Sequence, residues 1–275
     1  AEEHGYFRDE GLDYEFVRTF AVDATVQTTE SAPAEVKEGA YESMEAGRAC
    51  EVSSACHWAV NMAASAEHGR MYGRAYSMTP SGIFVPPESP VMRAADLAGV
   101  EIGVGYHSGS HFSALQALER FLAPEEISLR FIGLPNDRLR LLLERQVAAA
   151  NVFGIPYYVL EQQGFRRVVD TSFMIGFLIT GDSTDADVER YFRALQRAQR
   201  DIDLEPELYK HHFLKEMPAQ YHDTVDVRAF GTGERLVFEP YTREMYEKAH
   251  RWVENLRIFP EEQVGRAAYE AAVLA

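Results

Sequence analysis

The 275-residue chain has only two cysteines and no long apolar run. Cys50 and Cys56 lie near opposite ends of an expected short strand, which separates their side chains by more than a disulfide can span, so we expect two thiols. No apolar stretch approaches the roughly 18 residues of a membrane-spanning helix. The first residues, AEEHGYFRDEG, lack the basic and apolar regions of a signal peptide. These absences exclude a disulfide-stapled scaffold and a helical membrane span.

Basic residues are also scarce. The 27 Lys and Arg residues stand against 43 Asp and Glu, for a formal net charge of −16. Such a charge repels phosphate backbones and anionic lipid surfaces, so we expect neither a nucleic-acid partner nor membrane binding. The sequence contains no phosphate loop, dinucleotide-binding fingerprint or GxSxG elbow, and we expect no cofactor.

The patterns that are present alternate between strand and helix up to about residue 181. This alternation predicts an α/β fold with a mainly parallel sheet. Long helical patterns then predict a helical C-terminal tail. The expected strands or extended segments are 12–20, 49–54, 69–78, 81–87, 100–105, 127–134, 147–154, 166–170 and 172–181. The expected helices are 34–47, 55–65, a short one within 89–99, 106–122, 136–146, 155–165, 185–203, 205–216 and 241–256.

The order of these segments resembles one known family. MEAGRACEVSSA, SPVMRAADLAGVEIGVGYHSGSHFSALQALERFL and LLLERQVAAANVFGIPYYVLEQQGF are similar to three segments of the type II periplasmic solute-binding proteins. The similarity is to the branch of sulfonate, nitrate and thiamine-precursor binders. It implies two α/β lobes, 1–80 plus 175–275 and 81–174, joined by a double-crossover hinge. The family's first strand precedes the helix that opens this chain, so we expect a further segment upstream.

The strand-to-helix turn ACHW offers the first candidate site residues. Under the two-lobe interpretation Cys56, His57 and Trp58 face the cleft, where a helix N-terminus favours a thiolate. One interpretation is catalytic, with Cys56 as nucleophile and His57 as proton carrier. The other is that Cys56 packs, His57 contacts a ligand and Trp58 stacks on it or fills core.

The stretch GYHSGSHFS offers the second group. His107, Ser108, Ser110 and His111 surround a glycine at the mouth of an expected helix, where hydroxyl and N–H groups suit a carboxylate, sulfonate or phosphate. Plain helix capping by Ser108 or Ser110, with the histidines on the surface, is the alternative. We expect this segment and the one around His57 to lie on opposite sides of a single crevice.

Aromatic residues after the strand AAANV are expected to line the second lobe's wall of that crevice. Asn151 stands where many relatives carry an aspartate, so a ligand amine is not required. The candidate ligand-binding residues are therefore His57, Trp58, Tyr106, His107, Ser108, Ser110, His111, Asn151, Phe153 and Tyr157.

A metal site is a weaker interpretation of the same residues. His57, His107 and His111, with Cys56 and Glu45, are metal-ligating types, but their spacings match no zinc signature. We therefore expect no metal. His211, His212 and His250 lie in the helical tail, where we expect them to be solvated.

Two functions follow from the resemblance. The first is the solute-binding component of an ABC-type importer, which binds a small organic anion or aromatic acid between its lobes and signals closure to a membrane permease. Such a protein is periplasmic or a cell-surface lipoprotein. The second is a cytoplasmic enzyme on the same fold, similar to a desulfinase, a decarboxylase or a pyrimidine-precursor synthase, that uses Cys56 and His57.

Overall fold

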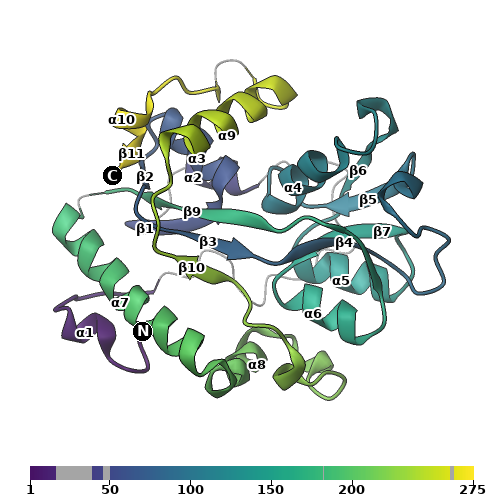
Figure 1. Ribbon diagram of the computed structural model, residues 1–275, viewed down its shortest axis with the longest axis horizontal. Coiled ribbons are helices and arrows are strands. Elements are labelled where there is room, and N and C mark those ends of the chain that lie inside the picture. Colours follow the sequence, from purple (N-terminus) through teal and green to yellow (C-terminus); the bar gives the residue numbers. More distant parts are fainter. Residues whose placement is uncertain (17–38, 46–49, 182, 261–262) are drawn as a thin grey trace.

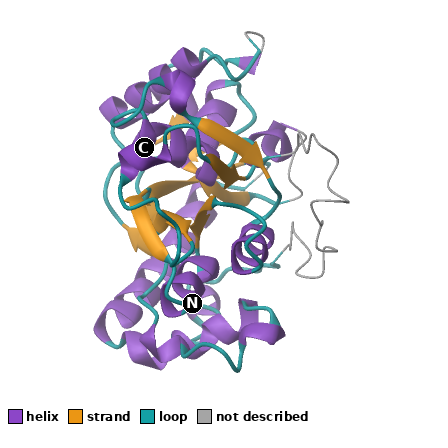
Figure 2. Ribbon diagram, turned by 90° about the vertical axis from the view of Figure 1, so that its right-hand side faces the viewer, coloured by secondary structure: helices purple, strands orange, loops and turns teal. Residues whose placement is uncertain are grey.

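A computed structural model describes residues 1–16, 39–45, 50–181, 183–260 and 263–275. In this part of the chain, two β-sheets lie side by side, and helices cover them (Figures 1 and 2). We call each sheet, with the helices packed on it, a lobe. The expected strand 12–20 and the expected helix 34–47 lie partly outside the described residues, at 17–38 and 46–49. The described part of that strand, 12–16, does not form a strand.

The first sheet is built around β9 (Phe173–Ile179), the strand that returns from the second lobe. β1 (Val52–Cys56) pairs with one edge of β9, and the consecutive strands β2 (Arg70–Tyr72) and β3 (Tyr76–Thr79) share the other. β10 (Arg235–Val237) pairs with β3 and β11 (Val273–Leu274) with β2. The C-terminal part of the chain therefore adds two strands to this sheet.

The second sheet has the strand order β6-β5-β7-β4-β8. β5 (Glu101–Val104) is parallel to both β6 (Ser128–Phe131) and β7 (Ala149–Phe153). β4 (Ser81–Val85) is antiparallel to β7 and to β8 (Arg166–Asp170). The loops that leave the carboxyl ends of β5, β6 and β7 therefore lie at one edge of this sheet.

The expectation of a mainly parallel sheet is wrong for the described strands. In the first sheet, β11 with β2 is the only parallel pair described. The reason is topological. β4 enters the second lobe directly from β3, and β9 leaves it directly from β8, so both strands run against their neighbours.

Two direct strand-to-strand crossings connect the sheets in the described part of the chain, β3 to β4 and β8 to β9 (Figure 1). The two crossings run next to each other, as a hydrogen bond of 3.0 Å from the Thr171 N–H to the Ser81 carbonyl shows. The strands of the first sheet lie at 52–79, 173–179, 235–237 and 273–274, and those of the second within 81–170. The lobe boundaries 1–80 plus 175–275 and 81–174 stay a prediction.

Helices cover both faces of each sheet. In the first lobe, α3 (His57–Ser65) packs on β9 and is backed by α9 (Arg243–Leu256), while α7 (Asp185–Leu204) covers the opposite face. In the second lobe, α4 (Gly109–Leu118) covers one face, and α5 (Pro135–Leu143) and α6 (Ile155–Gln162) cover the other. The remaining helices are α1 (Tyr6–Asp9), α2 (Ala40–Glu45), α8 (Phe213–Glu216) and α10 (Tyr269–Ala272).

The C-terminal tail is helical only in part. The pattern at 205–216 predicts a long helix, but the chain there forms 3₁₀ turns at Pro206–Leu208 and Lys210–His212 followed by the short α8. Pro206 cannot donate a helical hydrogen bond, which restricts it to the first turn of a helix. Apolar residues after this point pack into the second lobe beside α6, namely Phe213, Met217, Tyr221, Val227 and Phe230.

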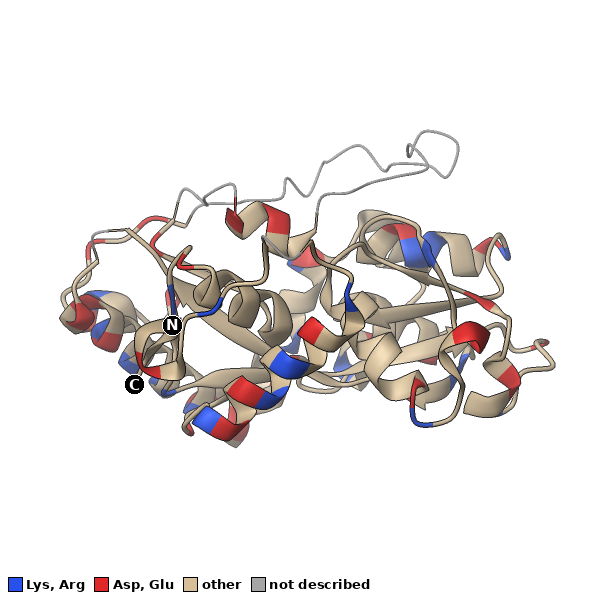
Figure 3. Ribbon diagram, turned by 90° about the horizontal axis from the view of Figure 1, so that it is seen from above, with Lys and Arg blue, Asp and Glu red and all other residues tan. Residues whose placement is uncertain are grey.

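Charged residues of both signs are intermixed over the outer helices (Figure 3). Many form pairs one helical turn apart, such as Arg140 with Glu144 at 2.8 Å, and such exposed pairs contribute little to stability. Among the described helices, none is long and apolar enough to cross a membrane.

Candidate functional site

The turn from β1 to α3 buries the first group of candidates. Cys56 is the residue before the first turn of α3, and its side chain is 3% exposed. The next residue, His57, shares a hydrogen bond of 2.9 Å between its Nδ1 and the Tyr241 hydroxyl. Burial lowers the pKa of His57 to about 3, so its imidazole is neutral at pH 7. Cys56 is the N-cap residue of α3, but its side chain does not cap the helix.

Trp58 lies where the two lobes meet. Its ring centroid is 5.7 Å from that of Phe112 on α4 and 5.9 Å from that of Phe173 at the start of β9. The side chain is 1% exposed, and its Nε1 has no hydrogen-bond partner among the described residues. A buried indole N–H without an acceptor is uncommon, and it marks a place where a ligand or water can accept a hydrogen bond.

The loop before α4 is held by two serine hydroxyls. The Ser108 hydroxyl donates to the Gly105 carbonyl at 2.8 Å, and the Gly105 N–H donates to the Ser110 Oγ at 2.9 Å. Ser108 is the N-cap residue, but its side chain does not cap the helix. His107 has a left-handed backbone with φ of 40°, which is unfavourable for a non-glycine residue and is common at functional loops.

The two histidines of this loop are buried between the lobes. His107 pairs through Nδ1 with Glu42 of α2, and its ring stacks on that of Tyr106 at 3.9 Å. His111 is 6% exposed, and no described residue bonds its Nδ1. Burial lowers the pKa of His111 to about 3, so this imidazole is also neutral. The expectation of surface histidines, the alternative to ligand binding, is wrong.

Asn151 is fully buried at the crossing between the lobes. Its amide group donates to the Ser110 carbonyl at 2.8 Å and to the Ser113 hydroxyl at 2.9 Å. Its side-chain oxygen accepts from Thr171 at 2.7 Å and from Ser81 at 3.2 Å. Because four protein groups satisfy this amide, it fastens α4 to both crossings.

The aromatic candidates lie in different surroundings. The Phe153 ring meets that of Phe173 edge-on at 5.5 Å, at the junction of the lobes. Tyr157 instead belongs to the core on the α5 and α6 side of the second sheet, where its hydroxyl accepts from Arg167 at 2.6 Å.

Arg138 is a candidate that the sequence reasoning missed. It lies in α5 with 1% exposure, and its guanidinium donates to the Asn151 carbonyl at 2.9 Å and the Gly133 carbonyl at 2.6 Å. Its Nη2 has no hydrogen-bond partner among the described residues. Burial lowers its pKa to about 10, which leaves it charged at pH 7. The only signal was a basic residue on the apolar face of DRLRLLL.

Contacts connect these groups into one region. Arg138 lies 5.8 Å from the Phe153 ring, which meets Phe173, which in turn meets Trp58. Trp58 also meets Phe112, so the segments around residues 57 and 110 are neighbours, while the crevice expected between them stays a prediction. The part each residue plays in ligand binding stays a prediction.

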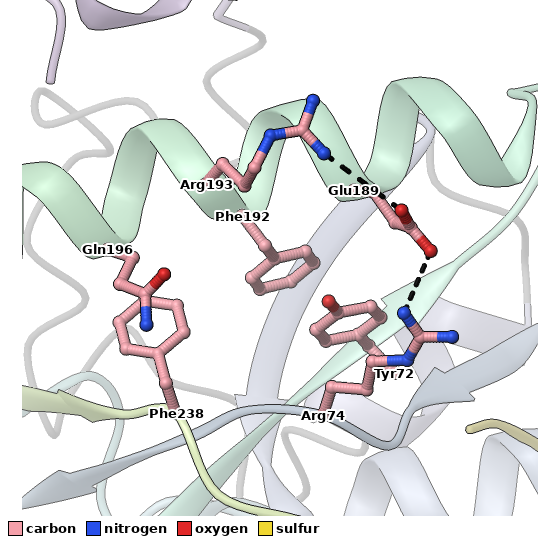
Figure 4. A pocket seen from close by; sticks show the side chains of 7 residues that line it. All are labelled: Tyr72, Arg74, Glu189, Phe192, Arg193, Gln196 and Phe238. Atoms are coloured by element: carbon pink, nitrogen blue, oxygen red, sulfur yellow. Dashed lines mark hydrogen bonds and ion pairs between the residues drawn. The ribbon is translucent and has the colours of Figure 1, made fainter.

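A separate groove lies on the first lobe between α7 and the first sheet (Figure 4). It is shallow, with a volume of about 290 Å³. The rings of Tyr72 and Phe192 stack at 3.8 Å along it, and Glu189 pairs with both Arg74 and Arg193. None of the sequence-predicted site residues lines it, and its charged groups pair with one another.

No protein-family model matches the sequence, and neither does any curated protein sequence. Solved structures do match. The alkanesulfonate-binding protein SsuA from Xanthomonas axonopodis pv. citri, bound to MOPS, aligns with a TM-score of 0.63 at 16% identity over 85% of this chain and 83% of its own. The periplasmic aliphatic sulphonate-binding protein SsuA from Escherichia coli aligns at 0.65 and 17% over 85% and 78%.

The chain has the two-lobe fold of type II periplasmic solute-binding proteins. This confirms the fold expected from the order of segments. The desulfurization enzyme DszB shares the fold, with a TM-score of 0.62 at 14% identity over 98% of this chain and 91% of its own. A cysteine-to-serine variant of DszB has been solved with biphenyl-2-sulfinic acid. The fold is thus compatible with both transport and enzymatic roles.

Proposed function

We propose that this protein is the solute-binding component of an ABC-type importer and holds a small organic anion between its lobes. The buried guanidinium of Arg138, with one unpaired nitrogen, carries the proposal. A buried charge is costly unless it is paired. Burial lowers the pKa of this guanidinium and the neighbouring Asp137 carboxylate raises it, but no described carboxylate accepts a hydrogen bond from it, so an anionic ligand would be a direct partner for the unpaired nitrogen.

Neutral polar groups lie elsewhere at the junction of the lobes. The indole N–H of Trp58 has no acceptor, and the Nδ1 of His111 has no partner, among the described residues. His57 and His111 are both neutral at pH 7, since burial lowers each pKa to about 3. One buried cation with several neutral polar groups suits a monoanion with several acceptor oxygens better than a dianion.

A sulfonate or sulfinate fits this description, and both groups occur in names of proteins with the same fold. SsuA is an alkanesulfonate-binding protein, and DszB has been solved with an aryl sulfinate. The rings of Trp58, Phe112, Phe153 and Phe173 would provide apolar surface for the organic part of the ligand. We therefore assign the ligand class as organic sulfonates or sulfinates, with carboxylates as weaker competitors.

As a transport component, the protein would act outside the cytoplasmic membrane, in the periplasm or as a surface lipoprotein. Its membrane partner would be the permease of an ABC importer. The two chain crossings at Ser81 and Thr171 would form the hinge, and ligand binding would rotate the two lobes toward each other about it.

The test is ligand-dependent stabilisation of the folded protein. A panel of alkane- and arylsulfonates, sulfinates and carboxylates should raise the melting temperature for at least one member, since a ligand that binds only the folded state stabilises it. Arg138→Met should weaken binding about tenfold or more. Arg130→Met, which removes an exposed arginine, should leave it unchanged.

Because Arg138 also supports two carbonyls, its loss could unfold the protein. Trp58→Phe avoids this problem, as it removes one N–H and keeps an aromatic ring. It should weaken binding several-fold, whereas Trp252→Phe should not, because the Trp252 N–H already donates to Glu119 at 3.0 Å. The absence of any shift across the panel would contradict a binding role.

The alternative is an enzyme that uses Cys56 on the same fold. The alignment with DszB, which extends over nearly the whole chain, favours it over other enzymatic roles. Incubation with aryl sulfinates and assay for released sulfite would reveal desulfinase turnover. Under this alternative Cys56→Ser abolishes turnover and leaves binding largely intact.

A further inference from the structure

Two histidines and a glutamate form a cluster far from the candidate site in sequence and in the fold. His211 and His212 lie in the second 3₁₀ turn after α7, Lys210–His212, and Glu3 lies in the first turn of the chain. One potential metal-ligand atom of each residue lies within 4.8 Å of the other two. It is the one such group of three in the part of the chain that the structure describes.

The hydrogen bonds of the cluster orient its side chains in a way that suits cation binding. His211 Nδ1 donates to the Leu208 carbonyl at 2.9 Å, which fixes the tautomer whose Nε2 lone pair is available. A backbone carbonyl behind a histidine is the usual support of a metal-ligating imidazole. His212 Nε2 lies 2.8 Å from the Glu3 carboxylate, so a cation can replace the proton that these two groups share.

We propose that Glu3, His211 and His212 bind one divalent transition-metal ion, for which Zn²⁺ is the appropriate probe. Two imidazole nitrogens and one carboxylate oxygen suit zinc, whereas calcium and magnesium require oxygen ligands. Water would complete the coordination, because Glu3 and His211 are exposed to solvent. Neighbouring ligand atoms of a tetrahedral zinc site lie about 3.3 Å apart, a spacing that these exposed side chains can reach by small rotations.

The ion would connect two regions that pack on different lobes. The N-terminal residues pack on α7 of the first lobe, where Asp9 pairs with Arg197 at 2.8 Å. The residue after His212, Phe213, packs instead against Tyr158 and Phe230 of the second lobe's core. Metal binding would therefore fasten the N-terminal turn to the segment that leads from α7 to the second lobe, and would stabilise the folded chain.

The experiment uses the full chain after chelator treatment and desalting. Titration calorimetry should show one Zn²⁺ bound per chain, and Zn²⁺ should raise the melting temperature while Ca²⁺ does not. His212→Ala and Glu3→Gln should each weaken Zn²⁺ binding about tenfold or more. Both side chains are at the surface, so circular dichroism should show an unchanged fold.

His222→Ala is the matched control, because this exposed histidine bonds only the Met217 carbonyl at 3.0 Å. It should bind Zn²⁺ as the unaltered protein does. Trp58→Phe, which keeps an aromatic ring, should also retain Zn²⁺ binding, which separates this site from the proposed anion site. Failure to bind Zn²⁺, or binding that survives His212→Ala and the double variant His211→Ala/His212→Ala, would overturn the proposal.

Discussion

The Ser81 hydroxyl lies 2.8 Å from that of Thr171, across the two chain crossings that connect the lobes. Both hydroxyls also bond the side-chain oxygen of Asn151, which is fully buried. The two crossings are thus tied to each other and, through the Asn151 amide, to the start of α4. A substitution at one of these residues should therefore affect the stability of both lobes.

Asn151→Ala should therefore lower the free energy of unfolding by at least about 2 kcal/mol, since it leaves several buried polar groups without partners. Urea denaturation measures this loss. Ser172→Ala is the control at the same crossing, because the Ser172 hydroxyl makes only a long contact of 3.4 Å with the Ser81 N–H and should cost less than about 0.5 kcal/mol. Equal losses of unfolding free energy in the two variants would contradict a stabilising role of the Asn151 hydrogen bonds.

Stability should fall as the pH drops below about 6.5. Burial lowers the pKa of His57 to about 3, whereas an unfolded histidine titrates near 6.5. Between these values the unfolded state binds the proton and the folded state does not, so the contribution of His57 is present above pH 6.5 and is lost on acidification.

His57→Gln should remove part of that dependence, about 1–2 kcal/mol of the loss between pH 7 and pH 5. Denaturant melts at the two pH values measure it. His222→Gln changes an exposed histidine and serves as the control. If His57→Gln leaves the pH dependence of the unfolding free energy unchanged, then His57 takes up a proton in the folded state.

Gly109→Ala should destabilise the junction of the lobes. A Cβ at this position would lie 2.3 Å from the Phe173 ring, closer than atoms can approach. We expect a loss of about 1–3 kcal/mol in unfolding free energy, although alanine is the better helix former. In a Phe173→Leu background the same change should cost less, and a double-mutant cycle measures the coupling. Additive effects would show that the two residues do not contact each other.

The two cysteines should differ in reactivity. Cys56 is 3% exposed and Cys50 is half-buried, so iodoacetamide should modify Cys50 about tenfold faster or more in the native protein. Peptide mass spectrometry measures both rates, and in denaturant they should converge. Faster modification of Cys56 would indicate an accessible thiolate and would favour the enzymatic alternative.

Much of the fold was predictable from the sequence. The elements expected at 100–105, 127–134, 147–154 and 166–170 correspond to β5, β6, β7 and β8 within a few residues. Their apolar runs are bounded by glycine and polar residues, a local signal that needs no knowledge of the rest of the chain. The tail was predicted less well, because residues 205–216 have a helical pattern but pack as short turns against the second lobe.

For the candidate site, the sequence predicted correctly only that two segments lie close together. The loop before α4 and the turn before α3 stand out by composition, and the structure places them together. The environment of each side chain was not predictable, because it depends on groups far apart in sequence. His107 meets Glu42, and His57 meets Tyr241, 184 residues further along the chain.

The sequence by itself thus indicated most strands and helices between residues 49 and 181 and the lack of a disulfide, which depend on local periodicity and composition. The two-lobe class was implied by the resemblance of the segment order to a known family. Tertiary structure alone decided that β9 runs antiparallel beside β1, that Arg138 is buried with an unpaired nitrogen, and that Asn151 joins the crossings. Burial and pairing depend on which distant segments meet, and no local pattern specifies that.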